Sequence, residues 1–125
     1  MDMTAAIAMD RMYRRQRHLY DATRRYYLLG RDLLIRRLDP MHGDHVLEIG
    51  CGTGRNLVVA ARRYPAARFY GIDVSTVMLT KAIDQLGCAG LSGRARVAHG
   101  DAAAFEPQRL FGRERFDRIF VSYSI

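Results

Sequence analysis

The chain has 125 residues, of which 49% are hydrophobic and 26% charged, a composition typical of a globular domain that excludes disorder as its main state. Its formal net charge of +7 comes almost entirely from arginine, since Lys81 is the only lysine. This charge suits a nucleic acid, an anionic membrane surface or an acidic small molecule, but it equally suits a solvated, arginine-rich surface. Two cysteines, Cys51 and Cys88, do not suggest a disulfide framework, so we expect a reducing compartment.

The N-terminal third of the chain predicts helices. A helical pattern runs from Asp10 to Leu29, and Gly30 is expected to break or kink it. A second helix is predicted over 31–38, with Leu34, Ile35 and Leu38 turned inward, and it ends before Asp39-Pro40. The first residues lack the basic and apolar regions of a signal peptide, and no apolar run could span a bilayer. We therefore expect residues 1–40 to form an accessory helical cap of a cytoplasmic protein, either free or at the inner face of the membrane.

Beyond residue 41, strands alternate with helices. The predicted strands are 45–49, 68–72, 94–99 and 116–122, and the predicted helices are 55–64 and 76–86, the latter capped by Ser75 and carrying Val77, Met78, Leu79, Ala82 and Ile83. Residues 87–93 and 102–111 read as loops, the second with one helical turn at most. Such alternation predicts βαβ units and a parallel sheet. Residues 41–125 are therefore expected to form a Rossmann-like α/β domain.

A glycine-rich turn follows the first predicted strand, in the pattern Glu48-x-Gly50-x-Gly52-x-Gly54. It is not a P-loop, because no Gly-Lys-Ser/Thr follows at the required spacing. It also departs from the dinucleotide fingerprint Gly-x-Gly-x-x-Gly, because Arg55 occupies the position of the third glycine. Cys51 is interpreted as a small filler in this turn, since no histidine or carboxylate is spaced to activate it as a nucleophile.

The remaining pattern resembles motif I of the class I S-adenosylmethionine-dependent methyltransferases. That resemblance implies that Asp73, after the second strand, binds the ribose hydroxyls, and that Asp101, after the third, accepts a proton from the adenine amine. A buried carboxylate at Glu48 is costly unless it is compensated, which the cationic groups of this cofactor would do. The residues implied to bind S-adenosyl-L-methionine are Glu48, Gly50, Cys51, Gly52, Thr53, Gly54, Asp73, Val74, Asp101, Ala102 and Ser122.

A second resemblance comes from the string His18-Leu-Tyr-Asp-Ala-Thr-Arg-Arg-Tyr-Tyr-Leu-Leu-Gly-Arg-Asp32. It looks like the bacterial diacylglyceryl-homoserine N-methyltransferases of betaine-lipid synthesis, which implies methylation of the headgroup amine of that lipid. Arginines on an aromatic-bearing helix suit an anionic membrane surface, and Arg24 or Arg31 could pair with the homoserine carboxylate. Tyr20 and Tyr123 are the candidates for accepting the amine proton.

Other expectations concern partners and metals. No nucleic acid is expected, because no RNA-binding module is recognisable, although the charge keeps an RNA methyltransferase or another small-molecule methyltransferase as alternatives. His18, His42, His45 and His99 make no metal-ligand set, so no metal is predicted. The oligomeric state is left open.

The resemblance also concerns the extent of the sheet. A class I methyltransferase has a seven-stranded sheet, whereas this chain accounts for four strands, in the predicted order 3-2-1-4. We therefore expect an incomplete methyltransferase sheet whose fourth strand is an apolar edge. A truncated, non-catalytic fragment is accordingly an alternative to an active enzyme.

Overall fold

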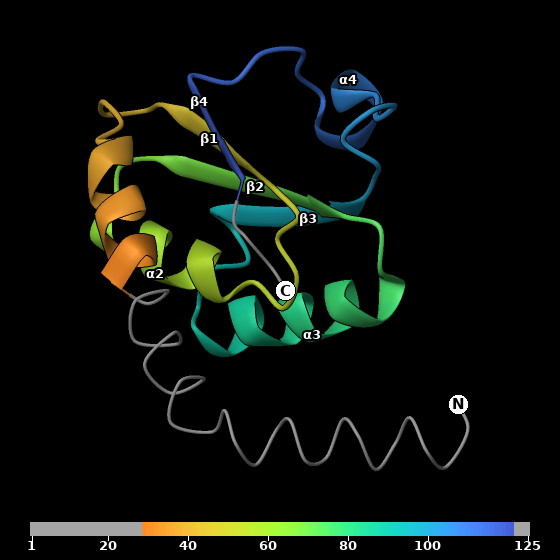
Figure 1. The fold of residues 1–125 in the computed structure, drawn as a ribbon, viewed down its shortest axis with the longest axis horizontal. Helices are drawn as coiled ribbons and strands as arrows, with labels where there is room; N and C mark the ends of the chain where they lie inside the picture. The colour runs from red at the N-terminus through yellow and green to blue at the C-terminus, as the bar shows by residue number, and fades with distance from the viewer. Residues whose placement is uncertain (1–28, 122–125) are drawn as a thin grey trace, which may run out of the picture. The chain divides into compact units, whose positions relative to one another are not determined.

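The computed structural model describes residues 29–121 of the chain. Contacts divide the chain into two compact units, Met1–Leu34 and Ile35–Ile125. The second unit contains a four-stranded parallel sheet in the order β3-β2-β1-β4 (Figure 1). The predicted α/β class and strand order are therefore confirmed.

The first described element is a helix over residues 29–38. Gly30 lies inside it, so the prediction that a helix begins at Arg31 was wrong. One glycine costs a helix about 1 kcal/mol, which the rest of the helix can offset. Ile35 and Leu38 are buried as expected, but Leu34 is 37% exposed and does not face the core. The helix ends before Asp39-Pro40, as predicted.

The sheet domain follows in alternating strands and helices. Its elements are β1 (His45–Ile49), α2 (Arg55–Arg63), β2 (Arg68–Asp73), α3 (Thr76–Cys88), β3 (Ala95–His99), α4 (Pro107–Phe111) and β4 (Arg118–Val121). All four predicted strands are present within a residue or two of their expected bounds among the described residues. The helix α3 is longer than predicted, because it continues to Cys88 through Gly87. None of the helices among residues 29–121 is long and apolar enough to cross a membrane.

Alternate residues of the strands face two separate apolar layers. On one face, Val46, Phe69 and Phe120 pack with Leu57 of α2 and Leu79 of α3. On the other face, Leu47, Tyr70 and Ile72 pack against Phe111 of α4, with Phe105 and Phe116 beside them. Figure 1 shows α2 and α3 together on one side of the sheet and α4 apart from them. The sheet is thus covered on both faces, which explains why its central strands read as continuous apolar runs.

The buried face of α3 differs from the prediction. Leu79, Ala82 and Leu86 are buried, whereas Val77, Met78 and Ile83 are 65%, 41% and 59% exposed. The helix carries apolar residues on more than one side, so its periodicity alone could not identify the inner face.

Candidate functional site

The glycine turn connects the carboxyl end of β1 to the start of α2. Its first two amides, those of Gly50 and Cys51, both donate to the carbonyl oxygen of Ile72, at 2.9 and 3.0 Å. These bonds fold the turn over the neighbouring end of β2. Gly50, Gly52 and Gly54 have φ values of 74°, 54° and 81°, which side chains rarely tolerate. The alternate glycines therefore follow from the backbone path of this turn.

The first turn of α2 faces the same edge. Gly54 is the N-cap residue, so no side chain caps the helix, and its first turn contains no acidic residue. The positive end of the helix dipole and the first-turn N–H groups can then serve an external anion. Gly54 also lets α3 approach closely, since a Cβ there would lie 3.2 Å from the Cβ of Ala82.

Asp73, the last residue of β2, fixes two loops at once. Its Oδ2 accepts from the amide of Gly52 at 2.8 Å, and its Oδ1 accepts from the amide of Ser75 at 2.8 Å. Ser75 itself caps α3, because its Oγ accepts from the amide of Met78 at 3.2 Å. A carboxylate has about four lone-pair sites, so two of them stay available for hydroxyl donors. Asp73 can therefore hold the turn and bind a diol together.

Glu48 lies on β1 beneath the turn and is fully buried. Its Oε2 accepts from the side-chain amide of Asn56 at 3.0 Å, and Asn56 belongs to the first turn of α2. A buried carboxylate needs such hydrogen bonds, because desolvation without them is costly. The pair therefore ties the strand before the glycine turn to the helix after it.

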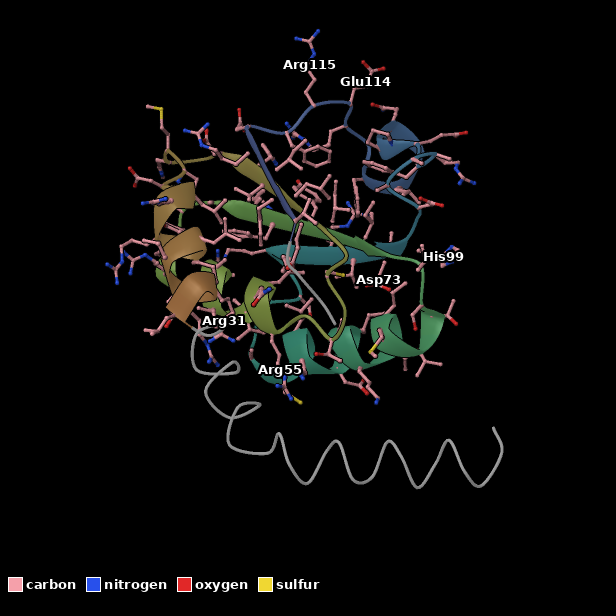
Figure 2. All side chains as sticks on the ribbon, in the orientation of Figure 1. Arg31, Arg55, Asp73, His99, Glu114 and Arg115 are labelled. Atoms are coloured by element: carbon pink, nitrogen blue, oxygen red, sulfur yellow. The ribbon has the colours of Figure 1, made fainter. Side chains whose placement is uncertain are left out.

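The loops after β2 and β3 meet beside Asp73. The amide of Gly100 donates to the carbonyl oxygen of Asp73 at 3.1 Å, and Nε2 of His99 lies 3.1 Å from the carbonyl oxygen of Val74. Figure 2 shows Asp73 and His99 at the same edge of the sheet. Val74 is 65% exposed there. These contacts bring together chain segments that the sequence separates by some 25 residues.

Asp101 is exposed and forms a turn within its own loop. Its Oδ1 accepts from the amide of Ala103 at 3.0 Å, and its carbonyl oxygen accepts from the amide of Ala104 at 3.0 Å. The local-turn interpretation of Asp101 thus describes its present contacts, while its carboxylate retains acceptor capacity for an amine donor. Ala102 is exposed beside it.

Cys51 is buried in the turn, and its environment is unfavourable for a thiolate. Burial, followed by the negative charges of Glu48 and Asp73, raises the pKa of Cys51 to about 12. Its Sγ and Cβ would lie 2.9 and 2.8 Å from a Cβ placed on Gly71. Cys51 therefore packs as a small side chain against a strand glycine, as interpreted from the sequence.

The structure thus gathers most of the predicted cofactor residues at one edge. Glu48, the turn 50–54, Asp73 and Val74 lie at the carboxyl ends of β1 and β2, and Asp101 and Ala102 follow β3. Tyr20, Ser122 and Tyr123 lie outside the described residues. Within residues 29–121, no three His, Cys, Asp or Glu side chains are grouped as a metal site would require.

Two residues of this site were missed from the sequence. Asn56 gave only a weak signal, as a polar residue on the inner side of an apolar helix. Gly71 gave a clearer one, since an isolated glycine within a strand often marks a close approach by neighbouring groups.

A family model described as a methyltransferase domain matches residues 46–125. Among curated relatives, the tRNA1(Val) (adenine(37)-N6)-methyltransferase of Porphyromonas gingivalis is 35% identical over 76 residues, or 61% of this chain and 30% of that protein. The trans-aconitate 2-methyltransferase of Paracidovorax citrulli is 36% identical over 75 residues, or 60% of this chain and 26% of that protein. The chain therefore spans less than a third of the length of these relatives.

Solved structures show the same fold. A S-adenosylmethionine-dependent methyltransferase from Thiobacillus denitrificans, in complex with S-adenosyl-L-homocysteine, is 31% identical, with a TM-score of 0.53 over 60% of this chain and 30% of that one. An RNA methyltransferase from Salinibacter ruber, also in complex with S-adenosyl-L-homocysteine, has a TM-score of 0.63 at 23% identity, over 74% of this chain and 56% of that one. Because the methyltransferase-domain model covers more than half of the sequence, the chain belongs to the methyltransferase-domain family and has the fold of the class I S-adenosylmethionine-dependent methyltransferases.

Proposed function

We propose that this chain binds S-adenosyl-L-methionine at the carboxyl edge of its sheet and serves as the cofactor-binding part of a methyltransferase. The observation that carries the proposal is the bond of 2.8 Å between the amide of Gly52 and the carboxylate of Asp73, which sets an acid beside a glycine turn and an uncapped helix N-terminus. Relatives that share the fold were solved with S-adenosyl-L-homocysteine, the demethylated product of this cofactor.

The residues at this edge match the chemical parts of the cofactor. Asp73 would accept the ribose hydroxyls through its remaining lone pairs, and the first-turn amides of α2 would hold the methionyl carboxylate. Glu48 would offset the positive charge of the methionyl end. Val74 and Ala102 would lie beside the adenine, with Asp101 as acceptor for its amine. The fit is a matter of donor and acceptor types at one edge of the sheet.

The cofactor, when bound, supplies a methyl group activated by a sulfonium. The contribution of the protein is alignment, because a direct displacement needs the donor, the methyl carbon and the nucleophile in line. An amine nucleophile must also lose a proton, for which we propose Tyr20 and Tyr123. Both lie outside the described residues.

We propose the headgroup amine of diacylglyceryl-homoserine as the substrate. Support comes from the similarity of the string 18–32 to the enzymes of betaine-lipid synthesis, and from arginines that suit contact with an anionic membrane from the cytoplasmic side. Of that string, the structure describes Leu29 to Asp32, where the guanidinium of Arg31 lies 3.6 Å from the carboxylate of Asp32.

RNA is a second candidate substrate. The relatives include enzymes named for tRNA and ribosomal RNA, and the net charge of +7 favours a polyanion. A domain that binds the cofactor without turnover is a third possibility, since the chain spans less than a third of its relatives' length.

Cofactor binding is tested by calorimetry with S-adenosyl-L-homocysteine. Wild-type protein is expected to bind, and Asp73→Asn to bind about 10- to 100-fold more weakly, as expected for losing hydrogen bonds to a charged acceptor. Asp84→Asn changes an exposed aspartate of α3 and is the matched control, with unchanged affinity. Wild-type protein that does not bind would refute the proposal.

Lipid analysis of a deletion strain tests the substrate. Loss of the trimethylated betaine lipid, with accumulation of its unmethylated amine, is expected. An unchanged lipid profile would exclude this substrate, and transfer of labelled methyl groups to purified RNA would favour the second candidate. Binding without transfer to either would indicate a domain that lacks turnover.

A further inference from the structure

Asn56 occupies an unusual place for a polar side chain. It is 8% exposed on the inner side of α2, where Leu57, Ala60 and Ala61 are its buried neighbours in the helix. Its side-chain nitrogen donates to Oε2 of Glu48 at 3.0 Å, and Glu48 has an exposed fraction of 0%. Asn56 and Glu48 are, moreover, the two buried polar or charged residues of the described chain.

The bond joins the two ends of the glycine turn. Glu48 precedes the turn on β1, and Asn56 follows it in the first turn of α2. Gly50 and Gly54 lie between them, and the amide of Gly54 donates to the carbonyl oxygen of Cys51 at 3.0 Å within the same turn. A displacement of the Glu48 carboxylate would therefore alter the edge at which the first-turn amides of α2 are presented.

The chemistry of an amide is well suited to this contact. The amide of Asn56 is neutral, so it fixes the orientation of the carboxylate without neutralising its charge. Lysine or arginine at this position would form an ion pair and compete with an external cation. Aspartate would repel Glu48, and leucine could not donate. An asparagine therefore holds the carboxylate in place while its negative charge stays available.

We infer that Asn56 is a positioning residue that directs the Glu48 carboxylate toward the ammonium group of the methionyl end of the cofactor. The inference rests on the proposed function, because it requires the cofactor at this edge. Asn56 acts through Glu48 and does not itself contact the reacting atoms.

Two ligands separate this role from a purely structural one. S-adenosyl-L-homocysteine has the amino-acid end, whereas 5′-methylthioadenosine keeps the adenosine and the sulfur but lacks that end. Calorimetry on the full chain, well below the unfolding temperature, is expected to show Asn56→Leu binding S-adenosyl-L-homocysteine about tenfold or more weakly. Its affinity for 5′-methylthioadenosine should be unchanged. Equal losses for both ligands, or no loss for either, would overturn the inference.

A second variant covers the case in which Asn56→Leu does not fold. The double variant Glu48→Gln, Asn56→Asp reverses donor and acceptor, so it keeps one hydrogen bond and the same net charge but moves the carboxylate to α2. It is expected to fold and bind 5′-methylthioadenosine, but to bind S-adenosyl-L-homocysteine about tenfold or more weakly. Wild-type affinity for S-adenosyl-L-homocysteine would contradict the inference. Wild-type protein that binds neither ligand would instead refute the proposed function.

Discussion

The absence of a side chain at Gly71 determines how the glycine turn packs on the sheet. A Cβ on this residue would lie 2.8 Å from the Cβ of Cys51 and 2.9 Å from Cδ1 of Leu57. Gly71 itself sits in the central strand β2, where its neighbours on both sides are buried. The turn can therefore reach the carbonyl of Ile72 only because β2 has a glycine at this position.

Gly71→Ala is expected to destabilise the fold by roughly 1–3 kcal/mol, the usual cost of forcing extra volume into a packed core. Chemical denaturation measures this loss as a lower midpoint at an unchanged slope. Gly93→Ala is the matched control, because Gly93 is exposed and a Cβ there would meet no atom within 4 Å. Equal stability of the two variants would show that Cys51 and Leu57 can move aside at little cost.

The two cysteines should differ strongly in reactivity. Cys51 is buried with its pKa raised to about 12, whereas Cys88 is exposed at the end of α3. Because the thiolate is the reactive form, iodoacetamide at pH 8 is expected to label Cys88 and leave Cys51 unmodified until the protein unfolds. Mass spectrometry of tryptic peptides reads this out, with urea-unfolded protein as the control in which both are labelled. Rapid labelling of native Cys51 would mean that the turn opens readily.

At the scale of elements, strands were easier to predict than helix faces. Strands β1 and β2 are short apolar runs bounded by turn residues, so their existence and order follow from local sequence. The inner face of α3 does not, because Ala82 is buried by the close approach of Gly54 from another element. Helix periodicity could not include that contact, since it depends on the path of the glycine turn.

The N-cap of α3 is a prediction from sequence that the structure supports directly. Ser75 has an extended backbone, and its Oγ accepts from the amide of Met78 at 3.2 Å. Ser75→Ala is expected to cost about 1 kcal/mol, measured by thermal or chemical denaturation. Ser92→Ala, at an exposed loop position, serves as the control with little effect. A loss no larger than that of the control would mean that water replaces the cap without cost.

At the scale of the whole molecule, the sequence predicted the sheet order and the edge that carries the candidate site. Both follow from strand–helix alternation, because parallel strands place all their carboxyl ends, and hence Glu48, Asp73 and Asp101, at one edge. The partners of those acids could not be predicted. The bond of Asp73 to Gly52, and that of Glu48 to Asn56, depend on the folded turn and on side-chain orientations that no local pattern encodes.

The opposite edge of the sheet contains a histidine that couples global stability to pH. His45 begins β1, and its Nδ1 lies 2.8 Å from the hydroxyl of Tyr70. Burial, and then the positive charge of Arg113, lowers the pKa of His45 below its ordinary value of 6.5. The neutral ring is therefore favoured in the folded state, and the unfolded chain takes up a proton first as the pH falls.

The stability due to this shift should be complete above pH 6.5 and decrease as the pH falls from there through the lowered pKa of folded His45. Denaturant unfolding of the wild type and of His45→Gln, at intervals from pH 7.5 to 5, measures it. The free energy of unfolding of the wild type, relative to the variant, is expected to fall steadily over that range. His42→Gln, which removes an exposed histidine, reports the background of such a substitution. A wild-type advantage that stays constant or grows toward low pH would show that burial of the His45 ring does not control this part of the pH dependence.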